Sequence, residues 1–339
     1  MRRWLCIRLA WMVVSLLGIT FVTFAVLDLA PVDRAQLAVA RQQGENGLLN
    51  LAAREQAILR LRVRYGLVDP DTLEPAPMWR RYGNWLGNAL SLRFAGPNED
   101  DRALWRRLMH ALPVTLWLGF LSLLVVGAVG VPLGAWLGMR AGSTADRLVS
   151  RFLFMLVGIP EFLLATLLLF GLCGLWLSWF PSGGLRSPGA ESWSIFRQIV
   201  DFAWHLVLPV VVMATGPTVL VVRFLRDTVA RASGSGWAAN LRALGTDDAT
   251  LRWRLVRNGA APLATLAGTL LPMLVSGSIV VENLFALDGI GHLAFQAVGD
   301  QDQSLVMALV VVTSTVTLLS LIASDLGHRL VDPRVRMSS

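Results

Sequence analysis

The sequence RASGSGWAANLRALGTDDATLRWRLVRNGAAPL, which covers residues 231–263, decides how the rest of the chain is arranged. It lies between two apolar runs that are long enough to cross a bilayer, so it must return to water between two crossings. Five arginines lie within it: Arg231, Arg242, Arg252, Arg254 and Arg257. Arginine-rich connections of this length normally face the cytoplasm. The stretch therefore predicts a membrane protein with a basic cytoplasmic loop.

Within this loop, the residue types predict two short helices separated by a turn. Residues 237–244 form the first helix, and Gly245 ends it because glycine enters the left-handed C-cap conformation without a Cβ clash. Residues 246–248 (Thr-Asp-Asp) then supply N-cap chemistry for a second, basic helix that ends near Asn258. We expect this compact loop to bind another protein.

The composition of the 339-residue chain supports a polytopic membrane protein. Hydrophobic residues make up 55% of the chain, and they are concentrated in runs. The formal net charge of +7 comes from arginine, since the sequence contains no lysine. Arginine can indicate nucleic-acid binding, but its interleaving with apolar runs favours a role in membrane topology. Cys6 and Cys173 give neither a disulfide framework nor a metal-binding spacing.

Six apolar runs predict six transmembrane helices. They cover residues 9–29, 113–139, 152–180, 206–225, 263–285 and 304–326. The run at 263–285 contains glycine, serine and proline, but small residues allow close helix packing in lipid. The short connections rich in arginine lie on one side of the membrane, which predicts that both termini are cytoplasmic.

Residues 30–108 have mixed charge and no run long enough to span a membrane. Residues 49–67 have apolar side chains at helical spacing, and residues 78–92 form an aromatic-rich amphipathic stretch that suits a membrane–water interface. We expect a helical region outside the cytoplasm. Two interpretations stay open: a folded loop that caps the helical bundle, or a surface for a partner that delivers substrate.

Prolines and one acid lie inside the predicted spans. The prolines are Pro132, Pro160, Pro209, Pro217 and Pro272. Each removes a backbone donor and tends to kink its helix. Glu161 follows Pro160 at a depth where a charge costs about 2.5–3.5 kcal/mol. Its carboxyl either faces a pathway for a polar or cationic substrate, or forms a hydrogen bond with a neighbouring helix.

The sequence contains no catalytic or energy-converting motif. A GxxxxGK[ST] phosphate loop needs a lysine, and no GxSxG elbow or suitably spaced pair of carboxylates occurs. The four histidines are far apart and form no ligand pair; they are His110, His205, His292 and His328. These observations predict neither an enzyme nor a metal site.

Several segments together carry a resemblance to a known family. They are LDLAPVDRA (27–35), WRRYGNWLGNALSLRFAG (79–96), LPVTL (112–116), VVENLFALDGIGHLAFQAV (280–298) and DPRVR (332–336). Over nearly its full length the chain resembles the integral membrane permease subunits of bacterial ABC importers, and within them the first permease of the dipeptide/oligopeptide/nickel group. Val32 and Arg34 depart from the usual glycine and proline of the first segment.

The resemblance implies the type I ABC importer permease fold, with a large periplasmic loop between the first two of six spans. It implies four regions. They are 1–29 with the first span, 30–108 as the periplasmic helical region, 109–327 as the core with a coupling loop at 226–262, and 328–339 as a cytoplasmic tail.

In this family a short coupling helix docks in a cleft of the cytoplasmic ATPase. The resemblance assigns this role to Trp237, Ala238, Ala239, Asn240, Leu241, Arg242, Ala243, Leu244 and Gly245. Ala239 stands where the family motif has its glutamate. Pro160, Glu161 and Glu282 are the candidates for the translocation pathway.

The implied partners are a second, homologous permease, two ATPases that bind ATP and Mg²⁺, a periplasmic solute-binding protein and the lipid of the bacterial inner membrane, with no nucleic acid. The chain itself is expected to bind no cofactor. Two alternatives stay open: a secondary transporter driven by an ion gradient through Glu161, and a nickel or metal-chelate substrate in place of a peptide. A scaffold without transport activity is a third class.

Overall fold

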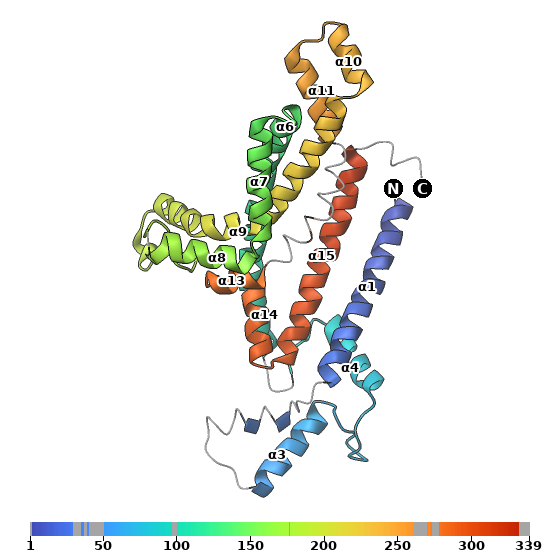
Figure 1. Ribbon diagram of the computed structural model, residues 1–339. Helices are drawn as coiled ribbons and strands as arrows, with labels where there is room; N and C mark the ends of the chain where they lie inside the picture. The colour runs from blue at the N-terminus through green and yellow to red at the C-terminus, as the bar shows by residue number, and fades with distance from the viewer. Residues whose placement is uncertain are drawn as a thin grey trace. The chain divides into compact units, whose positions relative to one another are not determined.

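The computed structural model describes residues 2–29, 35–36, 39–40, 51–96, 100–175, 177–260, 270, 272 and 278–331 (Figure 1). Within these residues the regular structure is helical, with one isolated β-bridge between Val68 and Pro75 and no strand. The chain divides into two compact units: residues 1–109 with 296–314, and residues 110–295 with 315–339. The all-α prediction is confirmed for the described part of the chain.

Four of the described helical segments are long and apolar enough to cross a membrane. They are α1 (Arg2–Leu29), α9 (Ile195–Ser233), α15 (Gln303–Val331), and α5 (Asp101–Val125) continued through a π-helical turn (Val126–Gly130) into α6 (Val131–Met139). They contain the predicted runs 9–29, 206–225, 304–326 and 113–139. With its 39 residues, α9 is about 58 Å long at 1.5 Å per residue, and therefore longer than the hydrocarbon core.

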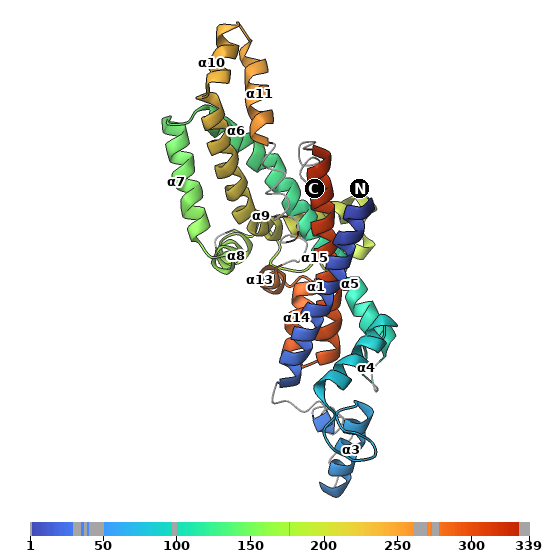
Figure 2. The same ribbon diagram turned by 90° about the vertical axis from the view of Figure 1, so that its right-hand side faces the viewer.

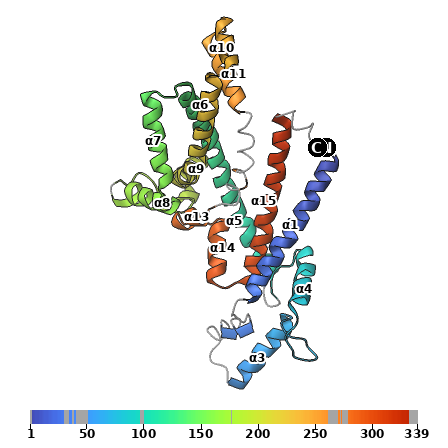
Figure 3. The same ribbon diagram turned by 45° about the vertical axis from the view of Figure 1, so that its right-hand side comes forward.

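The predicted span at 152–180 is divided by a bend and is not one continuous helix. α7 (Thr144–Gly158) and α8 (Glu161–Phe170) meet at a bend of 98°, and α8 runs across the end of α7 (Figure 3). Pro160 favours the break, because a proline disfavours the helical region for the residue before it. Ile159 accordingly has an extended backbone, with φ −85° and ψ 120°. A second π-helical turn (Gly171–Leu175) follows α8.

The predicted span at 263–285 lies mostly outside the described residues, which include 270, 272 and 278–285 of it. Its last part forms the short helix α13 (Ile279–Leu284), which is followed by α14 (Ile290–Gly299). The described helices thus give four candidate spans, or five if the bent pair counts as one. The count of six stays a prediction.

In the first unit, the predicted amphipathic stretches form α3 (Leu51–Arg64) and α4 (Met78–Leu90). α4 packs against α1 through a cluster of aromatic rings: Phe21, Phe24, Tyr82 and Trp85. Arg81 forms a two-pronged ion pair with Asp28 at the end of α1. These contacts hold the amphipathic helix α4 on the apolar helix α1.

Candidate functional site

The predicted binding loop is a helical hairpin at one end of the second unit, where α10 (Gly236–Ala243) and α11 (Asp248–Ala260) follow α9 (Figure 2). α9 continues to Ser233, so the first residues of the predicted 226–262 loop are helical. Of the nine residues assigned to coupling, Ala238 is buried and Leu241 half-buried, whereas the other seven are exposed. Leu244, at the tip of the hairpin, is 81% exposed.

Gly245 ends α10 as the sequence predicted. Its φ of +74° lies in the left-handed region, which side chains other than glycine adopt at a steric cost. The amide of Gly245 donates to the carbonyl of Arg242, and the amide of Thr246 donates to the carbonyl of Leu241. This pair of bonds is a Schellman motif, and it satisfies two carbonyls that the helix end would otherwise leave without partners.

The N-cap of α11 is also confirmed, and Asp247 provides it. Its Oδ2 accepts a hydrogen bond of 2.9 Å from the amide of Thr250, which is the bond expected between an N-cap side chain and the third helical residue. Hydrogen bonds from Thr250 hold the pKa of this exposed carboxyl below its usual range. The turn between α10 and α11 is therefore defined by local hydrogen bonds.

The inner face of the hairpin packs on the long helix α9. Ala238 of α10 and Leu251 and Leu255 of α11 form one buried cluster with Leu225, Val229 and Ala232 of α9 and Ala135 of α6. Burial of aliphatic side chains at this junction stabilises the attachment by roughly 1.5–3 kcal/mol for each large residue. The packing is therefore continuous from the hairpin into α9 and α6.

Three glycines that the sequence analysis did not single out bring α6 and α9 together. Gly130, Gly134 and Gly138 recur at every fourth residue. A Cβ atom on Gly134 would lie 2.8 Å from the carbonyl oxygen of Val222, and one on Gly138 would lie 2.7 Å from that of Arg226. Small residues at this spacing let two helix backbones approach closely in lipid. The four-residue spacing was visible in the sequence and is the signal that could have identified this contact.

A charged contact near the hairpin was also missed, because its two residues are 80 positions apart. The buried Asp146 of α7 accepts hydrogen bonds from Arg226 Nη2 at 2.7 Å and Arg226 Nε at 3.1 Å. Asp146 also accepts from the amide of Gly142, which precedes α7. A bidentate arginine–carboxylate pair has a fixed geometry. It attaches the start of α7 to α9 near the hairpin.

Glu161 lies at the first position of α8, directly after Pro160 and the bend. The N-terminus of a helix favours a negative charge, because its free amides and the helix dipole are positive there. Glu161 is exposed and shares a hydrogen bond with the hydroxyl of Ser278, which is the N-cap of α13. The structure thus contains the contact with a neighbouring helix that one interpretation of this acid required.

Glu282 on α13 is fully buried, with 0% of its surface exposed. Its Oε1 accepts from the hydroxyl of Thr115 at 2.7 Å, and its Oε2 accepts from the amide of His292 at 3.0 Å. Thr115 in turn accepts from the amide of Ile290 at 2.8 Å. The carboxyl therefore joins α5, α13 and the start of α14. Sequence reasoning singled out Glu282 but not Thr115, which is 167 residues away.

Residues 130–337 match the model of a family described as binding-protein-dependent transport system inner membrane component. The chain is 28% identical over 322 residues to the oligopeptide transport system permease protein AppB of Bacillus subtilis (strain 168), with 94% of this chain and 95% of the relative covered. It is 28% identical over 284 residues to the inner membrane ABC transporter permease protein YejB of Escherichia coli O157:H7, with 83% and 76% covered.

The oligopeptide transport system permease protein OppB of Mycobacterium bovis (strain ATCC BAA-935 / AF2122/97) is 30% identical over 277 residues, with 77% of this chain and 82% of the relative covered. These relatives favour neither an ion-gradient transporter built on Glu161 nor a nickel carrier. The match extends over the bent pair α7–α8, the hairpin and α15. The chain accordingly belongs to the binding-protein-dependent transport system inner membrane component family, as a permease subunit of an ABC importer.

Proposed function

We propose that this chain is one of two permease subunits of a binding-protein-dependent ABC importer for peptides. The names of its relatives, two of which are oligopeptide permeases, support the choice of substrate class. A second, homologous permease would form the other half of the pathway. Two cytoplasmic ATPases would bind ATP and Mg²⁺ and carry out the hydrolysis, so that this chain is a non-catalytic subunit. A periplasmic solute-binding protein would deliver the peptide.

The observation that carries this proposal is the division of the hairpin into two faces. Its inner face is packed on α9 and α6, and its outer face presents seven of the nine predicted coupling residues to water. A docking helix needs both properties, since it must contact the ATPase and move the helices behind it. Ala238 and Leu241 would then hold the helix in place, while Trp237 and Leu244 would contact the partner.

The topology completes the proposal. We place both termini in the cytoplasm of a bacterium, and residues 30–108 as a helical region in the periplasm. The bent pair α7–α8 would be the third of six spans, and residues 263–285 the fifth. Movement of the two permease subunits about the central pathway would expose the substrate alternately on the two sides.

For the pathway, we propose that Pro160 and Glu161 lie beside the translocated substrate. The bend at Pro160 ends one helix and begins another, and this exposes the first carboxyl of α8. Backbone that breaks a helix at membrane depth is tolerated where it lines a cavity or is buried in protein. Glu282 would act on the pathway indirectly, by holding α13 and α14 in position.

Co-purification tests the coupling role. The full chain is expressed with its candidate ATPases and isolated through a tag on the chain. Leu244→Glu should lower the amount of bound ATPase about tenfold, because interfaces lose this much when an apolar contact at the centre is replaced. Leu90→Glu is the matched control, since Leu90 is also 80% exposed but lies on α4.

Equal ATPase recovery with Leu244→Glu and with the wild type would overturn the coupling role. Peptide uptake by the chain alone, without any ATPase, would contradict the assignment to an ATP-driven importer. Uptake that persists in full after substitution of Glu161 would remove this residue from the pathway.

A further inference from the structure

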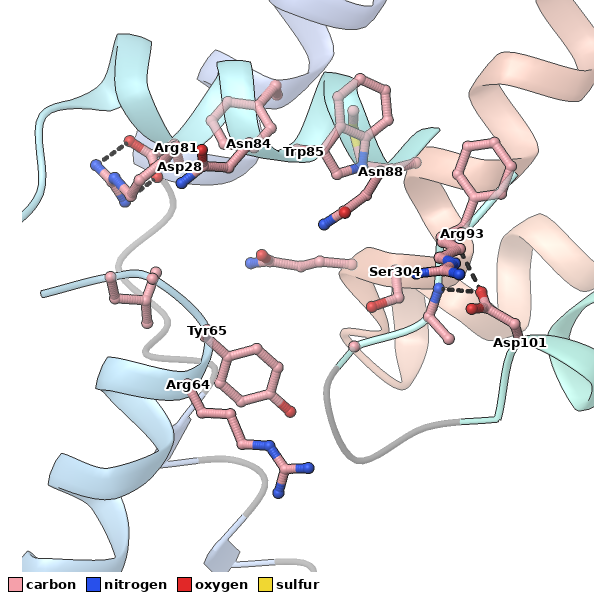
Figure 4. Close-up of a pocket in the computed structure, with 18 residues that line it drawn as sticks. Asp28, Arg64, Tyr65, Arg81, Asn84, Trp85, Asn88, Arg93, Asp101 and Ser304 are labelled. Carbon is pink, nitrogen blue, oxygen red and sulfur yellow. Dashed lines mark hydrogen bonds and ion pairs between the residues drawn. The ribbon is translucent and has the colours of Figure 1, made fainter. Parts of the chain in front are cut away.

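The first unit contains a pocket of about 360 Å³ that none of the proposed steps uses. Its lining comes from the end of α1, the end of α3, one face of α4, the loop at 91–96 and the first turns of α15 (Figure 4). Arg64 and Tyr65 lie on one side of it, and Trp85 and Asn88 of α4 lie on the other. The volume falls in the range of about 300–1,000 Å³ that is typical of small-molecule sites.

Three buried polar atoms of this lining have no hydrogen-bond partner within the described residues: Arg81 Nε, Trp85 Nε1 and Gln303 Oε1. Only two other side-chain atoms in the described part of the chain share this property. Buried polar atoms are nearly always paired, because an unpaired one has lost its hydrogen bond to water without gaining another. These two donors and one acceptor are almost fully covered by protein, and their concentration in the lining of one pocket marks it as the place where a bound ligand would complete the missing hydrogen bonds.

Each of these three side chains is held at another point. Both terminal nitrogens of Arg81 are bound to Asp28. The indole ring of Trp85 packs against Phe24 and Tyr82, and Gln303 Nε2 donates to the carbonyl of Leu27 at 3.5 Å. The free atoms are therefore fixed in direction before a ligand arrives, which lowers the entropy cost of binding.

The charges of the lining favour an anion. Three arginines (Arg64, Arg81 and Arg93) face two aspartates (Asp28 and Asp101). Asp28 is paired with Arg81, and Asp101 Oδ1 accepts from the amides of Phe94 and Ala95 at 2.8 Å. The guanidinium groups of Arg64 and Arg93 have no ion-pair partner in the residues that the structure describes. They are two further donors for an oxyanion.

From this geometry we infer that the pocket is a binding site for an oxyanion with an adjacent N–H donor. The oxyanion would accept from the arginines and from Trp85 Nε1, and the N–H would donate to Gln303 Oε1. A peptide C-terminus carries this pair as a carboxylate beside an amide, and a phosphoethanolamine headgroup carries it as a phosphate beside an ammonium. The choice of a peptide rests on the proposed function.

Equilibrium binding to the full chain in phosphatidylcholine nanodiscs tests the inference, because the choline headgroup has no N–H donor. The probes are tritiated Ala-Ala-Ala, its C-terminal amide and glycerophosphoethanolamine. We expect saturable binding of one oxyanion probe, and binding of the tripeptide amide at least tenfold weaker than that of the free acid.

Trp85→Phe removes one donor but keeps the aromatic cluster, and it should weaken the binding about tenfold. Trp79→Phe is the control, since Trp79 lies on the same helix, is 72% exposed and does not line the pocket. Binding of the tripeptide identifies a peptide site. Binding of glycerophosphoethanolamine in place of the tripeptide identifies a lipid headgroup as the source of the same chemistry.

Absence of binding by both probes overturns the inference, and so does equal binding by the Trp85→Phe and Trp79→Phe chains. The same preparations are assayed for ATPase association. A chain that retains its ATPases but binds neither probe overturns the pocket alone. A chain that binds a probe through Trp85 but associates with no ATPase overturns the proposed function alone.

Discussion

The hairpin α10–α11 and the segment around Glu282 both contain motif residues, yet most of these residues are exposed in the hairpin, while Glu282 itself is buried. Seven of the nine hairpin candidates are exposed, whereas Glu282 is fully buried, and its two carboxyl oxygens accept hydrogen bonds from Thr115 and from the start of α14. A motif residue can serve to bind a partner or to stabilise the fold of its own chain. Its burial and hydrogen bonds show which of these two roles it has, whereas its spacing in the sequence does not.

The largest effect that follows from this comparison is on stability. Glu282→Ala leaves the buried hydroxyl of Thr115 without its acceptor and removes the carboxylate that the amide of His292 binds, and loss of a buried partner costs about 1–3 kcal/mol. We expect the free energy of unfolding to fall by about 3 kcal/mol, measured as a lower apparent Tm in detergent. Leu244→Glu, on the exposed hairpin tip, should leave the Tm unchanged. A Glu282→Ala chain as stable as the wild type would contradict the structural role.

A smaller loss of stability is expected when the close contact between α6 and α9, next to the hairpin, is disturbed. Gly134→Ala places a methyl group 2.8 Å from the carbonyl oxygen of Val222, so α6 and α9 must separate, at a cost of about 1–3 kcal/mol. We expect a lower Tm together with ATP hydrolysis that is less well coupled to uptake.

Gly127→Ala provides the control for Gly134→Ala, because a Cβ at position 127 meets nothing within 4 Å. Equal Tm values and equal coupling for the two variants would show that close approach of α6 to α9 is not needed.

The smallest expected effect is a pH-dependent loss of the N-cap that Asp247 provides for α11. Since the pKa of Asp247 is depressed in the folded hairpin, its capping contribution is complete above the ordinary pKa of an aspartate and is lost as the pH falls through the folded value. Below about pH 4, the protection factors of the Thr250 and Leu251 amides in hydrogen exchange should decrease. Asp247→Asn keeps a capping oxygen without a charge, so its protection should not follow pH in this way.

Much of the hairpin could be predicted because its determinants are local. Gly245 and Asp247 act on amides and carbonyls within a few residues, so residue type alone indicates where α10 ends and α11 begins. The long apolar runs likewise predicted α1, α9 and α15, although amphipathic ends made α9 longer than its apolar run.

The features that could not be predicted depend on contacts between residues that are far apart in the sequence. Thr115 and Glu282, or Asp146 and Arg226, are separated by 167 and 80 positions, and no periodicity connects them. The inward direction of Ala238 follows from the packing of α10 on α9. Pro160 predicted a kink, but the 98° bend that divides the span at 152–180 could not be read from one proline.

The most direct test of the account is cross-linking between the hairpin and the ATPase. Single cysteines replace Leu244, Ala238 or Leu90 in a chain that carries Cys6→Ser and Cys173→Ser, and a short thiol-to-amine cross-linker is applied to the membranes. We predict a product that joins the chain to the ATPase from position 244, and none from the buried position 238 or from position 90 on α4. Equal yields from positions 244 and 90, or no product from position 244, would contradict the claim that the outer face of α10 meets the ATPase.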